Sequence, residues 1–216
     1  MSSNFTKIYQ DSINNPEKFW KDASEDIFWF KKPTKILNKS NPPFYKWYED
    51  GVTNTCYNAL DVHIDQGKGS KTALIYDSPI TGNKSKFTFE ELRSRVSRFA
   101  GALKNQGVDK GDRVIIYMPM IPEAVVAMLA CARIGAIHSV VFGGFASNEL
   151  ASRIDDSKAK LLVTASCGFE PGRTVEYKPL VDEAIKQAKH KISKMILFQR
   201  KDHEVKLNNP SEISWD

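Results

Sequence analysis

The feature that most constrains the fold is the apolar passage from Gly107 to Gly144, GVDKGDRVIIYMPMIPEAVVAMLACARIGAIHSVVFGG. Residues 113–118 are rich in valine and isoleucine, which predicts a strand covered on both faces. Pro122 is typical of a first helical turn and Gly135 of a helix end, and residues 136–142 are predicted to form the next strand. The helix is predicted to bury one apolar stripe, formed by Val125, Met128, Leu129 and Ala132.

The same alternation of strand and helix continues downstream. Ser147 is predicted to cap a helix that runs to about residue 156, and residues 160–164 are predicted to form a strand. A helix over residues 176–189 and a strand over residues 194–198 follow. Strands that alternate with helices through right-handed crossovers predict an α/β fold with a parallel sheet. The polar tail, residues 201–216, is predicted to add no closing element.

Upstream of this passage, residues 72–76 and 86–88 are predicted to be short strands on either side of the turn SPITGNKS. The sequence from Thr88 to Glu91 matches a capping box, in which a hydroxyl and a carboxylate bind free amides at a helix start. Gly107 is placed to end that helix. The buried stripe is predicted to be Leu92, Val96, Phe99, Ala100 and Leu103.

Residues 1–50 are rich in aromatic side chains and are interrupted by prolines. We expect an irregular N-terminal extension with a short helix near residues 16–23, whose aromatic rings bury area against another domain. Binding of an external partner by these rings is the alternative. Residues 58–66 have helical spacing, with Leu60 and Ile64 on one face.

The composition of the chain indicates which kinds of partner and which cellular compartment to expect. The net charge of +5 comes from scattered lysines without interleaved aromatic residues, which favours a solvated surface over nucleic-acid binding. The cysteines Cys56, Cys131 and Cys167 form no motif, so we expect reduced thiols in a cytoplasmic chain, with Cys131 in the core. The start of the chain lacks the apolar region of a signal peptide. Prolines and charges interrupt residues 114–141, which excludes a membrane span there.

Ligands of open parallel sheets bind beyond the carboxyl ends of the strands, and two of the three predicted loops there carry residues that suit a ligand; the other, residues 119–122, is interpreted as a structural turn. Phe142, Gly143 and Gly144 form either a surface that lets the backbone approach an anion or a tight turn from strand to helix. The second loop, residues 165–174, is unusually long. Its Arg173 is placed either to bind a phosphate or to form a surface ion pair with Glu170.

Other motifs are weaker. GKGSKT at residues 67–72 lacks the spacing of a nucleotide P-loop, and no GxGxxG follows a predicted strand. His138 lies among apolar residues of a strand, so we expect a core histidine rather than a catalytic base. We predict no catalytic triad and no catalytic residue in this chain.

The amino-acid sequence of residues 107–165 closely resembles the amino-terminal half of AMP-forming short-chain acyl-CoA synthetases. The resemblance extends to the upstream segments FTFEELRSRV and WYEDGVTNTCYNALDVHID. These are the acetate–CoA and propionate–CoA ligases of the adenylate-forming superfamily. The passage SCGFEPGRTVEYKPLVDEAI is more similar to the propionate type, because the acetate type tends to carry an arginine where Glu170 stands. The resemblance implies that residues 1–70 form the N-terminal extension and residues 71–216 the first, incomplete part of the AMP-binding domain.

The resemblance also implies a reaction. ATP and a short-chain carboxylate give an acyl-adenylate and pyrophosphate, and coenzyme A then accepts the acyl group. ATP, Mg²⁺ and coenzyme A are therefore expected for the full-length enzyme. Coenzyme A-binding positions fall on two groups of residues: Glu170, Pro171, Gly172 and Arg173, and Phe142, Gly143 and Gly144. Arg173 would contact phosphates.

The family's phosphate loop, acyl pocket and carboxy-terminal catalytic lysine have no counterpart in these residues. We therefore predict that this chain alone is inactive, since adenylation needs cations around the reacting phosphates. The alternative function is a stand-alone, non-catalytic module that binds coenzyme A or a nucleotide, or a partner protein. We also expect weak stability, because a sheet of this kind keeps an unpaired edge.

Overall fold

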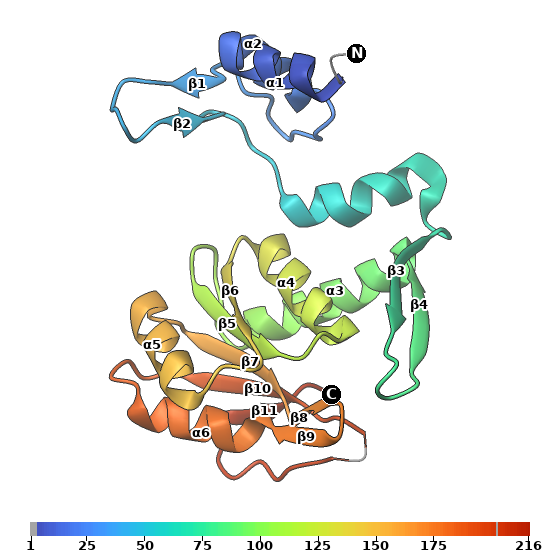
Figure 1. The fold of residues 1–216 in the computed structure, drawn as a ribbon, viewed down its shortest axis with the longest axis vertical. Helices are drawn as coiled ribbons and strands as arrows, with labels where there is room; N and C mark the ends of the chain where they lie inside the picture. The colour runs from blue at the N-terminus through green and yellow to red at the C-terminus, as the bar shows by residue number, and fades with distance from the viewer. Residues whose placement is uncertain (1–3, 202) are drawn as a thin grey trace. The chain divides into compact units, whose positions relative to one another are not determined.

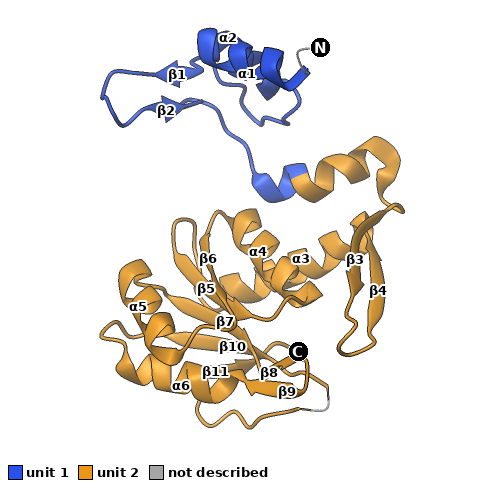
Figure 2. Ribbon diagram, viewed as in Figure 1, with its two compact units in different colours: residues 1–58 blue, residues 59–216 orange. Residues whose placement is uncertain are grey.

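The computed structural model describes residues 4–201 and 203–216. The chain separates into two compact units, residues 1–58 and 59–216 (Figure 2). The first unit contains two helices, α1 (Asn4–Asn14) and α2 (Pro16–Ser24), and a short antiparallel pair, β1 (Leu37–Asn38) and β2 (Lys46–Trp47). The helix predicted near residues 16–23 is confirmed as α2, whereas α1 was not predicted.

Aromatic residues of the first unit contact one another. The rings of Trp29 and Tyr48 are 5.4 Å apart between centroids, and those of Phe28 and Tyr57 are 4.8 Å apart. Such pairs add stabilisation beyond the area they bury. The docking of these rings on another domain stays a prediction.

The second unit is built on a parallel sheet of five strands in the order β11-β10-β7-β5-β6 (Figure 1). The strands are β5 (Arg113–Met118), β6 (Ile137–Phe142), β7 (Leu161–Ala165), β10 (Lys194–Phe198) and β11 (Glu212–Ser214). The predicted parallel α/β sheet is confirmed. The expectation for residues 201–216 is wrong, because β11 pairs with β10 through backbone hydrogen bonds that a polar composition does not reveal.

Helices cover both faces of this sheet. On one face α3 (Phe89–Asn105) packs against α4 (Pro122–Ile134), and on the other α5 (Ser147–Ser157) packs against α6 (Tyr177–Gln187) (Figure 1). Side chains on the α5–α6 face include Ile115, Tyr117 and Leu162. Because strand residues alternate, the neighbouring Val114, Ile116 and Leu161, also fully buried, lie on the α3–α4 face.

The start of α3 agrees with the sequence. The Glu91 amide donates to Thr88 Oγ1, and the Thr88 amide donates to the Glu91 carboxylate, which completes the capping box. The predicted buried residues of α3 are all buried, and Gly107 follows the helix with φ of +82°. The two strands before α3 are also confirmed as the antiparallel pair β3 (Thr72–Asp77) and β4 (Lys84–Thr88).

Thr88→Ala is expected to lower the free energy of unfolding by about 0.5–2 kcal/mol, because the Glu91 amide loses its acceptor. Urea denaturation followed by circular dichroism measures the change. Ser97→Ala, at an exposed position within α3, is the matched control and is expected to change stability by less than about 0.5 kcal/mol. Equal effects of the two substitutions would contradict a stabilising role for the cap.

The stripe predicted for α4 is wrong. Val125, Met128, Leu129 and Ala132 are only half-buried, and the core side of the helix is formed instead by Ala124, Val126, Ala127, Ala130 and Cys131. The helix is apolar on nearly all sides, so periodicity does not single out one face. Small residues on the core side let α4 approach α3 closely. The burial predicted for Cys131 is confirmed, and burial raises the pKa of its thiol to about 12.

Three further local predictions need correction. Ser147 does not cap α5, since Ala146 occupies the cap position and no side chain bonds to the free amides there. His138 is exposed, because its strand β6 is the outermost strand of the sheet. Residues 58–66 form wide π-helical turns, η1 (Tyr57–Asp61) and η2 (Ile64–Lys68), rather than a regular α-helix.

The long loop predicted at residues 165–174 is an antiparallel hairpin of β8 (Cys167–Glu170) and β9 (Arg173–Glu176). Its turn consists of Pro171 and Gly172, and Gly172 has φ of +74°, which favours glycine. Within the residues that the structure describes, no helix combines the length and apolarity needed to cross a bilayer.

Candidate functional site

The turn after β6 is held by the hydroxyl of Tyr117. This hydroxyl lies 2.7 Å from the carbonyl oxygen of Phe145 and 3.2 Å from that of Gly143, and the two oxygens share the single proton that it donates. Tyr117 is fully buried in β5, so the bonds tie the turn to the centre of the sheet. The predicted residues Gly143 and Gly144 therefore lie in a positioned turn at the carboxyl end of the sheet.

Tyr177, the first residue of α6, connects this turn with the β8–β9 hairpin. A methyl group on Gly143 would lie 2.8 Å from the ring carbon Cζ of Tyr177, and one on Gly168 would lie 3.0 Å from the same atom. The Tyr117 and Tyr177 rings are themselves 4.9 Å apart between centroids. Burial raises the pKa of Tyr177 to about 12, so its hydroxyl stays protonated at neutral pH. The structure thus brings the bases of the two predicted loops together around one tyrosine.

At the tip of the hairpin, Arg173 and Glu170 form an ion pair. Nε and Nη2 of Arg173 lie 2.7 and 2.6 Å from Oε2 of Glu170. Both side chains are exposed, and an exposed pair of this kind contributes at most about 1 kcal/mol to stability. The ion pair, one of the two alternatives that the sequence left open for Arg173, is therefore present. It is weak enough for a competing anion to displace Glu170 from Arg173.

The hairpin tip forms one wall of a cavity of about 760 Å³. Its lining combines hairpin residues with the turn after β3 and the end of β10: Ile80, Thr81, Asn83, Phe169, Glu170, Gly172, Arg173, Thr174, Arg200 and Lys201. The guanidinium of Arg200 lies over the Phe169 ring at 4.8 Å from the centroid. Three cationic side chains and one carboxylate give the cavity an excess of positive charge, which suits a phosphorylated ligand.

Of the three basic residues in this cavity, Arg173 was predicted from the sequence and Arg200 and Lys201 were not. Their signal was a basic pair one residue beyond a predicted strand, at the carboxyl end where ligands bind. Phe142, Gly143 and Gly144 do not line this cavity. Their contribution to coenzyme A binding, like that of Glu170, Pro171, Gly172 and Arg173, stays a prediction.

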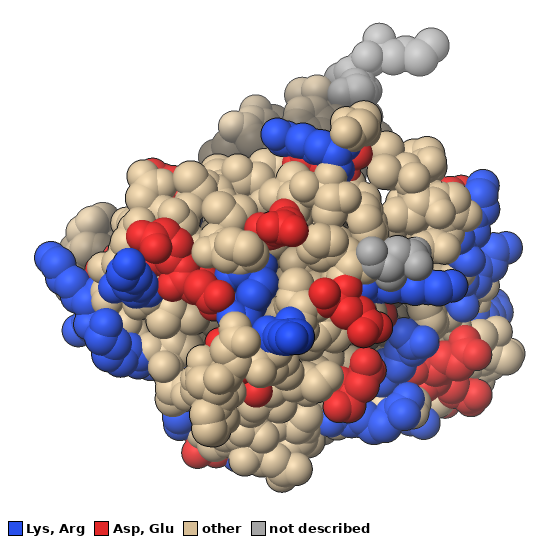
Figure 3. All heavy atoms as spheres, turned by 90° about the horizontal axis from the view of Figure 1, so that it is seen from below, with Lys and Arg blue, Asp and Glu red and all other residues tan. Residues whose placement is uncertain are grey.

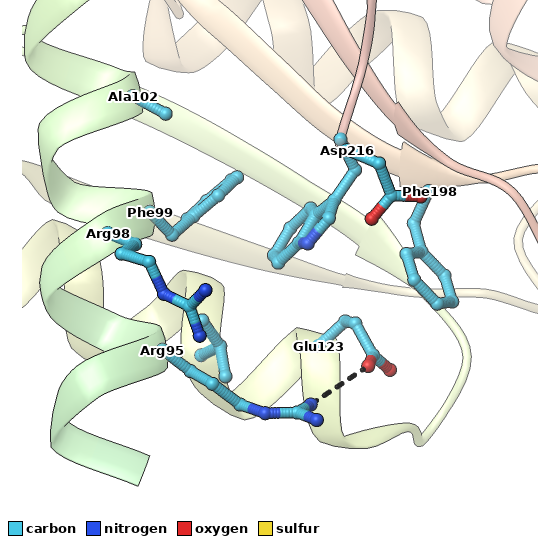
Figure 4. A pocket seen from close by; sticks show the side chains of 9 residues that line it. Arg95, Arg98, Phe99, Ala102, Glu123, Phe198 and Asp216 are labelled. Carbon is cyan, nitrogen blue, oxygen red and sulfur yellow. Dashed lines mark ion pairs between the residues drawn. The ribbon is translucent and has the colours of Figure 1, made fainter. Parts of the chain in front are cut away.

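A second cavity, of about 520 Å³, lies between α3 and the end of β10 (Figure 4). Its apolar side is formed by Phe99 and Trp215, whose rings stack with centroids 3.8 Å apart. At its edge Nη1 of Arg95 lies 3.6 Å from Oε1 of Glu123. None of the predicted site residues lines this cavity.

The remaining surface offers no concentrated charge on the face of the second unit that Figure 3 shows, where basic and acidic side chains are interspersed. Within residues 4–201 and 203–216, no three His, Cys, Asp or Glu side chains gather as they do around a bound metal ion.

The fold and the sequence match known proteins. Residues 61–215 match the family described as AMP-binding enzyme, and residues 5–59 match the acetyl-coenzyme A synthetase N-terminus. The chain belongs to the AMP-binding enzyme family. This result confirms the resemblance on which the sequence analysis relied, and the two matched regions meet close to the division between the compact units at residue 58.

Several curated relatives carry the names of acyl-CoA synthetases or ligases. The chain is 52% identical to human acyl-CoA synthetase short-chain family member 3, mitochondrial, over 99% of its own length and 31% of the relative's. It is 47% identical to propionate–CoA ligase of Escherichia coli, covering 91% of this chain and 31% of the ligase. Acetyl-coenzyme A synthetase of Streptomyces avermitilis is 44% identical, with 97% and 32% covered. The chain thus spans about a third of the length of these relatives.

A solved structure supports the fold. Acetoacetyl-CoA synthetase from Streptomyces lividans superposes with a TM-score of 0.86 at 23% identity, over 99% of this chain and 32% of that one. The similarity covers both compact units and confirms the acyl-CoA synthetase-like α/β fold.

Proposed function

We propose that this chain is the amino-terminal part of a propionate–CoA or acetate–CoA ligase, which activates a short-chain carboxylate with ATP and transfers the acyl group from the acyl-adenylate to coenzyme A. The observation that carries the proposal is the identity of 44–52% to short-chain ligases over nearly the whole chain. The charge of the hairpin cavity agrees with it, since coenzyme A is polyanionic.

In this proposal the chain binds and orients coenzyme A. Arg173 exchanges its bond to Glu170 for a phosphate oxygen, and Arg200 and Lys201 add positive charge in the same cavity. Phe142, Gly143 and Gly144 contribute the backbone of the turn after β6 to the same binding surface. The groups that stabilise the adenylation step would come from the remaining two thirds of the ligase, so the chain alone is expected to be inactive.

A hybrid ligase tests the function. The chain is fused at Asp216 to the remaining two thirds of the E. coli propionate–CoA ligase, and formation of propionyl-CoA and acetyl-CoA is measured by chromatography. We expect the hybrid to form an acyl-CoA in an ATP-dependent reaction, and each of the two separate parts to form none.

Two outcomes would count against the proposal. A folded but inactive hybrid would contradict the ligase function, and if the isolated chain still bound coenzyme A, the stand-alone binding module would be favoured instead. Acyl-CoA formation by the isolated chain would contradict its predicted inactivity.

Arg173→Ala is expected to raise the KM of the hybrid for coenzyme A about tenfold, the equivalent of one charge-assisted hydrogen bond of about 1.5 kcal/mol. The KM for ATP should stay unchanged. Arg98→Ala, which removes an exposed arginine from the other cavity, is the control and should leave the KM for coenzyme A as it was. Equal KM values for coenzyme A in the two variants would show that Arg173 does not bind coenzyme A.

A further inference from the structure

The outer edge of β6 is open. β6 is the last strand of the five-stranded sheet, and in the part of the chain that the structure describes only β5 pairs with it. Alternate amides and carbonyls of β6 therefore point away from the sheet without a strand to bind them. Edge strands are usually protected by charges, prolines or bulges. The β6 sequence, IHSVVF, has no acidic, lysine, arginine or proline residue, and its register with β5 is continuous.

Apolar side chains accompany this edge. Ile137, Val140 and Phe142 of β6 are 55%, 53% and 70% exposed, and Met120, just after β5, is 89% exposed. Phe142 lies opposite Met118 in the register, so Met120 follows close to the same end of the sheet. We call these four residues the edge strip. Because side chains alternate along a strand, Ile137 lies on the opposite face of β6 from Val140 and Phe142, so exposed apolar residues flank this edge on both faces. Exposed apolar surface of this kind marks interaction surfaces.

The opposite edge of the sheet differs. Its outer strand, β11, has only three residues, and the Glu212 side chain there is 7% exposed and bound to Lys178. Just beyond β11, Trp215 stacks on Phe99. A short strand with bound side chains is a poor template for a further strand. Of the two outer strands of the five-stranded sheet, β6 is therefore the one that offers a full-length, apolar edge.

We propose that a β-strand from the remaining two thirds of the ligase pairs with β6 and covers the edge strip. This inference rests on the proposed function, since it needs those residues to exist. They are the natural occupant because the chain makes up only 31–32% of its relatives, so most of the polypeptide that could cover this edge lies outside it. Strand addition satisfies the free backbone groups of β6, while Val140 and Phe142 become buried against the added segment.

Hydrogen exchange of the β6 amides tests this pairing without reference to activity. In the isolated chain the outward-facing amides of residues 137–142 should exchange quickly. In the hybrid ligase the same amides should exchange at least about 100-fold more slowly, because a paired strand must open before they exchange. Equal exchange in the two proteins would overturn the proposal. Protection that appears in the isolated chain and rises with its concentration would also overturn it, in favour of pairing between two copies.

A pair of lysine variants adds a second measurement. Val140→Lys places a charge on the edge strip, and Ile75→Lys places the same charge on β3, at a residue that is 65% exposed. In the hybrid, Val140→Lys should accelerate exchange of the β6 amides at least about tenfold and Ile75→Lys should not. Similar exchange rates of the β6 amides in both variants would contradict the proposal. If Val140→Lys fails to fold, the comparison of exchange between the unmodified chain and the unmodified hybrid still tests the pairing.

The outcomes separate this inference from the proposed function. An active hybrid with unprotected β6 amides would support the proposed function and contradict the strand pairing. An inactive hybrid with protected amides removes the function and keeps β6 as an interaction surface for that polypeptide.

Discussion

Replacing Lys178 with methionine is expected to lower the free energy of unfolding by about 3–5 kcal/mol. Lys178 lies in α6, and its side chain is only 6% exposed. Its Nζ is 2.7 Å from Asp182 and 3.1 Å from Glu212, and the Glu212 side chain is 7% exposed. Methionine fills a similar volume but leaves the Glu212 carboxylate buried without its cation. Since Glu212 belongs to β11, that strand should separate from the sheet first.

Urea denaturation followed by circular dichroism measures this loss. Lys186→Met, at an exposed position on the same helix, is the matched control and should change stability by less than about 0.5 kcal/mol. A Lys178→Met protein as stable as the control would show that the buried ion pair contributes nothing measurable.

The same pair predicts a dependence of stability on pH. Burial alone would raise the pKa of Glu212, but hydrogen bonds from the Asn208 amide, Lys178 and Asn209 outweigh it, so the pKa lies below the usual 4.5. The folded state thus holds the proton less tightly than the unfolded state. The contribution of Glu212 is complete above pH 4.5 and is lost as pH falls through its folded pKa. In Lys178→Met the acid-induced loss of stability should become smaller.

In the second unit, the sequence predicted those features correctly that depend on a single short sequence motif. The capping box at Thr88 and the glycine at position 135 mark their helix ends as expected, because each acts through the adjacent backbone. The α4 stripe failed because that helix is apolar on nearly every side. The exposure of His138 depends on the order of strands in the sheet, which neighbouring residues do not encode.

The candidate site shows the same division. The sequence indicated both loops beyond the carboxyl ends of strands, and the family resemblance pointed to Arg173. It did not indicate that Arg200, Lys201 and the turn after β3 share a cavity with the hairpin tip. It also missed Tyr177, which lies between the two loop bases, because a tyrosine at the start of a helix has no distinctive pattern. These contacts join residues that are distant in the sequence, so they depend on how the whole unit packs and leave no local sequence pattern.

Gly143→Ala is expected to lower the free energy of unfolding by about 1–3 kcal/mol, because the new methyl group overlaps the Tyr177 side chain. Tyr177 cannot easily move aside, since it is 5% exposed and its ring packs against Tyr117. The turn after β6 must shift instead, against the hydrogen bonds that the Tyr117 hydroxyl donates to it.

A double-mutant cycle, measured by urea denaturation, tests this cause. Tyr177→Phe removes the hydroxyl oxygen that lies nearest to the new methyl group, so Gly143→Ala should cost at least about 0.5 kcal/mol less in the Tyr177→Phe background. Gly101→Ala is the matched control, because an added methyl group in α3 meets no atom within 4 Å. That substitution should stabilise the chain by about 0.5–1 kcal/mol, since alanine favours helix more than glycine does. Additive effects in the cycle would show that Tyr177 does not exclude a side chain at position 143.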